Sequence, residues 1–242
     1  MAAGAPDPEA WGLPPGSGFE PLSKSDPGAV LRGTGRNRGY VFRKTRRSEA
    51  ALAWLDLLHA PVARAGLILL VPAPTVERAR SWQGWTAEPY LSSRPLHPHR
   101  LSGLRAALRR MHDLGAGLPQ RPGFAAARAV MTRGGGGDID LSAMPRDVAR
   151  ACRMAWEPIP DQPLGLVHGA LTPQSAGVAA SGKLVLYDWD AARIDHPLFD
   201  AVAVGAADDP MAKRAALAYE TARIWSTEPD RARTLAALLL SE

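Results

Sequence analysis

The chain has 242 residues, enough to bury a hydrophobic core, and its 46% apolar content argues against wholesale disorder. The net charge is +5, and the single cysteine, Cys152, excludes an internal disulfide framework. No apolar run reaches the length of a membrane span and no signal peptide is evident, so we expect a cytoplasmic protein without a membrane partner.

The N-terminal quarter changes character near residue 18. Residues 1–17 are rich in Gly, Pro and Ala without periodicity, which predicts a flexible tail. Short strands are expected at residues 29–32 and 39–44, on either side of a glycine-rich turn at 33–39. Glycines let backbone N–H groups approach phosphates closely, but many hairpins carry them, so this turn alone is weak evidence for phosphate binding.

Basic residues end the second of these strands, and a helix with a polar cap follows. Arg43 and Lys44 are the basic residues, while Ser48 and Glu49 begin the helix. One interpretation is a solvated basic corner, with Glu49 placed favourably at the helix N-terminus. The other is a functional ion pair between Glu49 and one of the two cations.

The middle of the chain predicts further strands and a helix. Residues 65–71 form a short branched apolar run typical of a buried strand, and residues 82–91 form a strand that ends at a proline. Leucines and Met111 recur at helical spacing over residues 101–114. Residues 115–140 are expected to be a loop with a flexible break at its glycines, and the remaining helices are expected at 144–156, 201–206, 210–225 and 229–240.

The most informative stretch runs from Leu166 to Asp200. A short apolar run leads into His168-Gly169, and a hairpin of residues 176–179 and 183–187 delivers Asp188. We expect the polar residues after these two strands to face one another.

This layout resembles the catalytic segment of the aminoglycoside phosphotransferase and choline kinase-like family, which has a His-Gly-Asp loop, an Asn five residues later and an Asp after a hairpin. The matching positions here are His168-Gly169-Ala170, Ser175 and Asp188. The resemblance implies an α+β, two-lobed protein-kinase-like fold. Its small β-rich N-lobe would span residues 18–91 and its mainly helical C-lobe residues 92–242.

The resemblance also implies roles for the residues of this segment. Ala170 occupies the position of the base that accepts the substrate's proton, so this position is degenerate. Asp188 would hold Mg2+ on the phosphates of ATP, with Ser175 as a weaker ligand in the Asn position. His168 would brace the loop, and Asp190 would support Asp188 or cap the following turn. Asp200 would steady the catalytic loop, although it could also serve as a helix cap.

On the nucleotide side, the resemblance implies a strand cation that binds the α and β phosphates and an acid that orients it. The pair would be Arg43 or Lys44 with Glu49. The segment between the lobes would bind adenine, which places Glu88, Tyr90 and Leu91 at the cofactor.

Three functions remain open at this point. The first is a pseudokinase-like protein that binds ATP and Mg2+ with impaired or absent phosphotransfer. The second is an active kinase for a small hydroxylated molecule, with His168, Asp190 or Asp195 as a displaced base. The third is a module whose seven basic residues between 32 and 47 bind nucleic acid or an acidic partner, although few aromatic residues lie among them.

Overall fold

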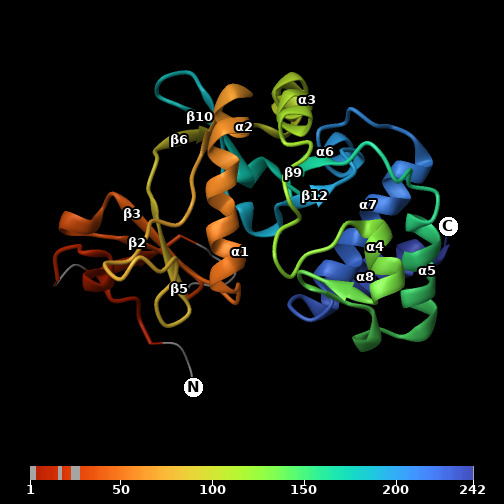
Figure 1. The fold of residues 1–242 in the computed structure, drawn as a ribbon, viewed down its shortest axis with the longest axis horizontal. Helices are drawn as coiled ribbons and strands as arrows, with labels where there is room; N and C mark the ends of the chain where they lie inside the picture. Colours follow the sequence, from red (N-terminus) through yellow and green to blue (C-terminus); the bar gives the residue numbers. More distant parts are fainter. Residues whose placement is uncertain (1–3, 16–17, 23–27, 242) are drawn as a thin grey trace.

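The computed structural model describes residues 4–15, 18–22 and 28–241 and shows a mixed α+β chain (Figure 1). A β-rich part, coloured red to yellow, lies on one side, and a mainly helical part, coloured green to blue, lies on the other. The predicted fold class is confirmed. Within these residues, no helix is both long and apolar enough to cross a bilayer.

The first sheet has four antiparallel strands in the order β1-β2-β3-β5. Phe42 of β3 is fully buried and packs with Trp85 of β5, so the inner face of this sheet is aromatic. The strands are β1 (Phe19–Pro21), β2 (Val30–Gly33), β3 (Tyr40–Lys44) and β5 (Trp85–Pro89).

The N-terminal segment covers this aromatic face, in contrast to the flexible tail expected for residues 1–17. Its 3-10 helix, Pro8–Trp11, places the Trp11 ring edge-on to Phe42 at 5.6 Å, and the Trp85 indole N–H donates to the Gly4 carbonyl at 2.9 Å. Burial of the large Trp11 ring compensates for ordering a segment with little periodicity. Residues 1–3 and 16–17 of the predicted tail lie outside the described residues.

The second sheet joins segments from both halves of the chain, in the order β4-β11-β10-β6. Strand β4 is parallel to β11, and the other pairs are antiparallel, including the predicted hairpin β10-β11. Strand β4 lies within residues 18–91, and the other three strands lie beyond residue 91, so the predicted boundary between the lobes falls within this sheet. The boundary stays a prediction. The strands are β4 (Leu67–Leu69), β6 (Ser93–Pro95), β10 (Ala176–Ala179) and β11 (Leu184–Leu186).

Helices α1 (Glu49–Ala53) and α2 (His59–Arg64) lead from the first sheet to the second, and α3 (Arg105–Leu114) packs beside them. Helix α1 begins where the Ser48 hydroxyl accepts from the Ala51 N–H, and it continues through a 3-10 turn into α2. Helix α3 buries its predicted apolar stripe against β9 and α2.

The C-terminal half is built on a helical core around Trp156. Strand β9 (Gly165–Val167) pairs with β12 (Arg193–Asp195) (Figure 1). The turn after β9 meets the end of β11, where His168 Nε2 lies 2.8 Å from the Tyr187 carbonyl oxygen. The remaining elements are α4 (Ala127–Arg133), β7 (Gly135–Gly136), β8 (Ile139–Asp140), α5 (Arg146–Trp156), α6 (Leu198–Ala203), α7 (Pro210–Arg223) and α8 (Pro229–Ser241).

The region predicted as a loop, residues 115–140, differs from expectation. It contains α4 and the short hairpin β7-β8, in which Gly135 and Gly136 form β7 and Gly137 and Asp138 form the turn. A side chain at Gly136 would lie 2.8 Å from Ala125 Cβ, and one at Gly137 would lie 2.9 Å from the Phe124 ring. The glycines therefore permit close packing against residues 124 and 125. The expected flexible break is instead a packed turn.

Candidate functional site

Asp188 lies where the two halves of the chain meet. It follows β11 with a left-handed backbone (φ 61°, ψ 65°), a conformation that an Asp adopts more readily than most residues. Its side chain is exposed and lines two adjoining spaces. We call the smaller, about 140 Å3, the inner cavity, and the larger, about 870 Å3, the cleft.

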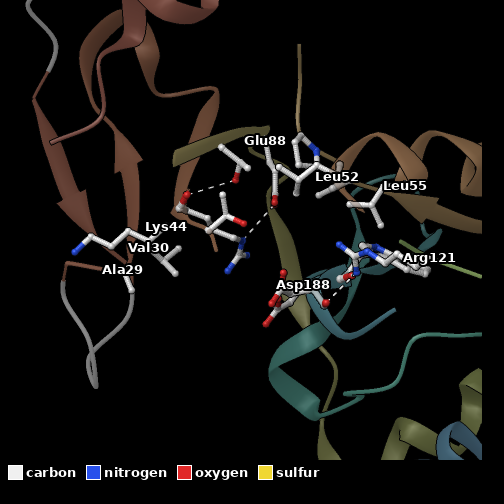
Figure 2. A pocket seen from close by; sticks show the side chains of 15 residues that line it. Ala29, Val30, Lys44, Leu52, Leu55, Glu88, Arg121 and Asp188 are labelled. Carbon is white, nitrogen blue, oxygen red and sulfur yellow. Dashed lines mark hydrogen bonds and ion pairs between the residues drawn. The ribbon is translucent and has the colours of Figure 1, made fainter. Parts of the chain in front are cut away.

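Arg43 lines both spaces and faces Asp188. Its Nε lies 3.4 Å from the Glu88 carboxylate, and the two side chains are largely buried (Figure 2). Burial lowers the pKa of Arg43, but the carboxylates of Glu88 and Asp188 outweigh it, so the pKa is raised. Burial also leaves the pKa of Glu88 above its ordinary value despite Arg43. Arg43 is therefore a permanent cation beside Asp188.

The expected pair between Glu49 and a strand cation is not made. The Glu49 carboxylate accepts from the Arg80 N–H and from the Ser81 hydroxyl at 3.5 Å, so it caps a neighbouring loop. Glu88, on the strand next to Arg43, supplies the carboxylate instead. The sequence did not reveal this pair, because it needs the β3-β5 register.

Lys44 points to a different place from Arg43, since successive residues of a strand face opposite sides. Its ammonium lies 5.5 Å from the Trp85 ring, and Figure 2 shows the side chain extending away from Asp188. Lys44 lines only the inner cavity. Of the two cations left open by the sequence, Arg43 is the one that faces the acid.

The segment after β5 was expected to bind adenine, and its residues contact other parts of the protein. The Tyr90 N–H donates to the Gly39 carbonyl at 2.7 Å, and its ring stacks 3.9 Å from the Arg32 guanidinium. The Leu91 carbonyl accepts from the Tyr187 hydroxyl at 3.1 Å. Tyr90 and Leu91 line neither space, whereas Glu88 lines the inner cavity through its side chain.

The turn after β9 is held from below. Asp200 is 1% exposed and accepts from the N–H groups of His168 at 2.8 Å and Gly169 at 2.9 Å, and its Oδ2 lies 3.0 Å from His112 Nε2. Burial alone would raise the pKa of Asp200, but these partners lower it. The prediction that Asp200 steadies this loop agrees with its contacts.

His168 is fully buried, and its Nε2 donates to the Tyr187 carbonyl at 2.8 Å. This bond ties the turn after β9 to the end of β11. A side chain at Gly169, which has φ +79°, would overlap Arg193 and lie 2.7 Å from the Ala191 carbonyl oxygen. The loop therefore packs directly against the turn that follows Asp188 and against Arg193 of β12.

Ala170 and Ser175 line the cleft at the two changed positions. Ala170 presents only a methyl group. Ser175 forms a capping box with Thr172: its Oγ accepts from the Thr172 N–H at 2.8 Å, and its N–H donates to the Thr172 hydroxyl at 3.2 Å. The serine hydroxyl thus shapes the turn in addition to facing the cleft.

Asp190 is bound by Arg47, which donates to its two carboxylate oxygens at 2.8 and 2.5 Å. Although burial raises the pKa of Asp190, the hydrogen bonds and charge of Arg47 lower it overall. Asp190 is consequently the ion-pair partner of Arg47, and its two expected roles, supporting Asp188 or capping the following turn, stay predictions.

Three basic residues of the segment 32–47 form ion pairs with acids of the protein. Arg32 pairs with Glu20 at 3.3 Å, Arg43 with Glu88, and Arg47 with two aspartates. Three of the seven basic residues expected to form a positive surface are therefore paired with acids of the protein, which weakens the interpretation of this segment as a nucleic-acid site.

Two buried arginines of the site were missed by the sequence analysis. Arg121 is 1% exposed and donates to the carbonyls of Ala51, Trp189, Asp190 and Ala192. Burial lowers its pKa to about 10. Arg193 is fully buried and pairs with Asp195 at 2.8 Å. Arginine usually lies at the surface, and no local sequence pattern indicated that these two are buried.

Within the described residues, no group of three or more His, Cys, Asp or Glu side chains is arranged to hold a metal. Mg2+, however, is commonly held by one or two carboxylates together with phosphate oxygens and waters. The single exposed carboxylate of Asp188, beside a cleft with a cation on its wall, fits that donor set.

The comparisons with known proteins concern the family and the fold of the chain. The model of a family described as the phosphotransferase enzyme family matches residues 19–235. No curated protein matches the chain. Among solved structures, choline kinase LicA from Streptococcus pneumoniae is similar at 12% identity and TM-score 0.63, with 93% of each chain covered.

Two further structures are similar. A spectinomycin phosphotransferase solved with ADP and spectinomycin is 11% identical, with TM-score 0.52 and 97% of this chain and 91% of that chain covered. An aminoglycoside phosphotransferase from Alicyclobacillus acidocaldarius is 12% identical, with TM-score 0.52 and 100% and 97% covered. These likenesses support the fold, and together with the family model they show that the chain belongs to the phosphotransferase enzyme family.

Proposed function

We propose that this chain binds a nucleotide with Mg2+ in the cleft beside Asp188, and that its phosphotransfer is impaired or absent. The observation that carries the proposal is the contrast between two residues of one cleft. Asp188 presents a carboxylate with Arg43 beside it, while Ala170 presents a methyl group where the family has its proton acceptor.

On the nucleotide side, Arg43 would bind phosphate oxygens, because a buried guanidinium beside an open cleft is suited to bidentate binding of phosphates. Glu88 would orient Arg43 from below. Mg2+, when bound, would neutralise charge on the phosphates, with Asp188 as its protein ligand. The similar spectinomycin phosphotransferase structures contain ADP in one case and AMP in another, which supports nucleotide binding here.

The three groups considered as displaced bases are bound by other groups of the protein. His168 is fully buried and donates to the Tyr187 carbonyl. Asp190 is bound by Arg47. Asp195 is 1% exposed and receives Arg193 and the Ala127 N–H. None of the three lines the cleft, so the proposal of weak catalysis is favoured over that of a displaced base.

The far wall of the cleft favours a small neutral or zwitterionic hydroxylated molecule as its second ligand. Glu220 is bound by Arg223 at 2.7 Å and by Arg231 at 2.8 Å, and Glu228 is bound by Arg231 at 3.0 Å. These four residues balance in charge, as do Arg43 and Asp188. A polycation would find each acid of this far wall already paired with an arginine.

Isothermal titration of the full chain with ADP and ATP, with and without Mg2+, tests the proposal. We expect binding that Mg2+ strengthens, and no phosphate transfer to a panel of small alcohols. Asp188→Ala should remove the strengthening by Mg2+, because it removes the carboxylate ligand assigned to the ion and leaves only the weaker hydroxyl ligand expected of Ser175. Mg2+-independent binding in the unaltered chain, or rapid turnover, would contradict the proposal.

A further inference from the structure

Arg47 joins three distant segments at the edge of the site. It lies in the loop between β3 and α1, and its side chain is only 9% exposed. Its guanidinium donates to the Asp138 carboxylate at 2.7 and 2.5 Å and to the Asp190 carboxylate at 2.8 and 2.5 Å. One cation therefore binds an acid from the β7-β8 turn and an acid from the turn after β11, two residues beyond Asp188.

The Asp138 side of this junction is preformed. The glycine turn that carries Asp138 is seated on the Phe124 ring, against which Gly137 is packed. The same ring lies 5.0 Å below the Arg47 guanidinium and 4.5 Å from that of Arg121. Since Asp138 is fixed by close packing, it holds Arg47 at a defined place.

The Asp190 side is fixed from two directions. Arg121 donates through Nη1 to the carbonyls of Trp189 and Asp190 at 3.1 and 2.9 Å, while Arg47 holds the Asp190 carboxylate. The turn that begins at Asp188 is thus held at its backbone by one arginine and at a side chain by another. The left-handed backbone of Asp188 depends on such support, since it is strained for a residue with a side chain.

Arg47 also connects the two walls of the cleft. It is three residues beyond the end of β3, the strand that carries Arg43, and it binds the turn that carries Asp188. A movement of this strand relative to the turn would break the bonds to Asp190. These contacts keep the cation and the acid of the site facing one another.

We propose that Arg47 is a positioning residue, which with Asp138 clamps the Asp188 turn to the β3 side of the cleft and so sets the carboxylate for the metal. The proposal rests on the Mg2+-nucleotide function proposed above. It predicts that the clamp controls the coupling between Mg2+ and nucleotide, and leaves the affinity for metal-free nucleotide nearly unchanged.

The test compares Arg47→Met with the unaltered full chain, by titration of ADP with and without Mg2+ and by thermal unfolding. We expect the factor by which Mg2+ strengthens ADP binding to fall about fivefold or more, within the usual range of coupling between two ligands. Metal-free ADP affinity should change less than about twofold. Arg47→Lys keeps the charge without the planar fork and should give an intermediate factor.

Asp138→Asn provides a second variant in case Arg47→Met folds poorly, because it weakens the clamp while leaving Arg47 paired with Asp190. It should lower the Mg2+ factor in the same direction. Arg128→Met is the matched control: Arg128 pairs with Asp161 at 3.0 Å, away from both the cleft and the inner cavity, and its loss should leave the factor unchanged.

The outcomes separate the clamp from the proposed function. If Asp188→Ala removes the Mg2+ factor but Arg47→Met and Asp138→Asn keep it, the clamp is contradicted and the function stands. A loss of affinity that is equal with and without Mg2+ would also contradict the clamp, since a merely structural role predicts it. If Asp188→Ala leaves the factor intact, the function and the clamp fall together.

Discussion

The turn after β9 and the turn after β11 lie side by side, and they differ in what they retain. The first keeps the residues that hold it, including Asp200 beneath His168 and Gly169, but has Ala170 at the reactive position. The second keeps both its supports and its acid, Asp188. Support and chemistry are therefore carried by separate side chains, and one can be lost while the other is maintained.

The supports of the first turn are buried, which explains how it can remain intact without its reactive group. Asp200 is 1% exposed and satisfies two backbone donors that would otherwise be buried without partners. Ala170, by contrast, lines the cleft, where a change of side chain leaves the packing beneath untouched. The two turns therefore differ in the chemical group that each presents to the cleft.

The largest effect is expected from restoring the first turn. If its frame is intact, Ala170→Asp with Ser175→Asn should raise the rate of ATP-dependent phosphate transfer to a small alcohol by about 100- to 10,000-fold, the usual contribution of a positioned base. The rate is measured as ADP release in the presence of the alcohol. The double variant also restores the amide that the family uses beside the metal.

Ser175→Asn alone is the control for this restoration. It changes the metal side without adding a proton acceptor, so it should not raise the rate. A double variant that binds Mg2+ and ADP but remains inactive would show that the frame of the first turn has departed from a productive geometry, and the comparison of the two turns would fail.

The next effect concerns the support itself. Asp200→Asn should lower the free energy of unfolding by about 3–5 kcal/mol, the cost of breaking a buried ionic group away from its partners. Chemical denaturation of the unaltered chain and the variant measures the loss. A change below about 1 kcal/mol would mean that the bonds from His168 and Gly169 contribute little to stability.

The pH dependence of this loss is fixed by the sign of the shift. The folded pKa of Asp200 is below its ordinary value, so its stabilisation is present above about pH 4 and is lost as pH falls through the folded pKa. The gap between the unaltered chain and Asp200→Asn should narrow in that window. A gap that is constant from pH 6 to pH 3 would contradict the assignment.

A smaller effect separates the two strand cations. Arg43→Met should weaken nucleotide binding by about 10- to 100-fold, equivalent to the roughly 1.5–3 kcal/mol of a hydrogen bond to a charged group. Lys44→Met should change it less than about twofold, because Lys44 extends toward Trp85. Titration with ADP compares them, and a larger loss from Lys44→Met would reverse the assignment.

Much of this architecture could be predicted from local pattern. The strand expected at residues 39–44, the hairpin before Asp188 and the leucine spacing of α3 predicted elements that the structure contains. Helix α4 was missed because it is short and follows a long segment without periodicity. The packed N-terminus was missed because Trp11 is the one aromatic residue of this Gly/Pro-rich segment, and one ring gives no periodic signal.

The site was less predictable, because its ion pairs join residues far apart in the chain. Arg43 pairs with Glu88 across a strand register, and Arg47 with Asp138 and Asp190 through tertiary packing. Glu49 was the expected acid because it is close in sequence, and its helix instead presents it to Arg80 and Ser81. Sequence spacing indicates which residue types are available, whereas the partners follow from how the elements pack.

The smallest effect tests from which side Asp188 is positioned. The Tyr187 hydroxyl bonds to the Leu91 carbonyl and, at 2.6 Å, to Ser93 Oγ, so it fastens β11 to the segment after β5. Tyr187→Phe should therefore cost about 1 kcal/mol of unfolding free energy. It should leave the Mg2+ factor for ADP unchanged, because the His168 ring still holds the Tyr187 carbonyl and Arg47 still holds Asp190. If the factor falls as far as in Arg47→Met, the acid is positioned through the strand before it as well as through the contacts of Arg47 with the turn after β11.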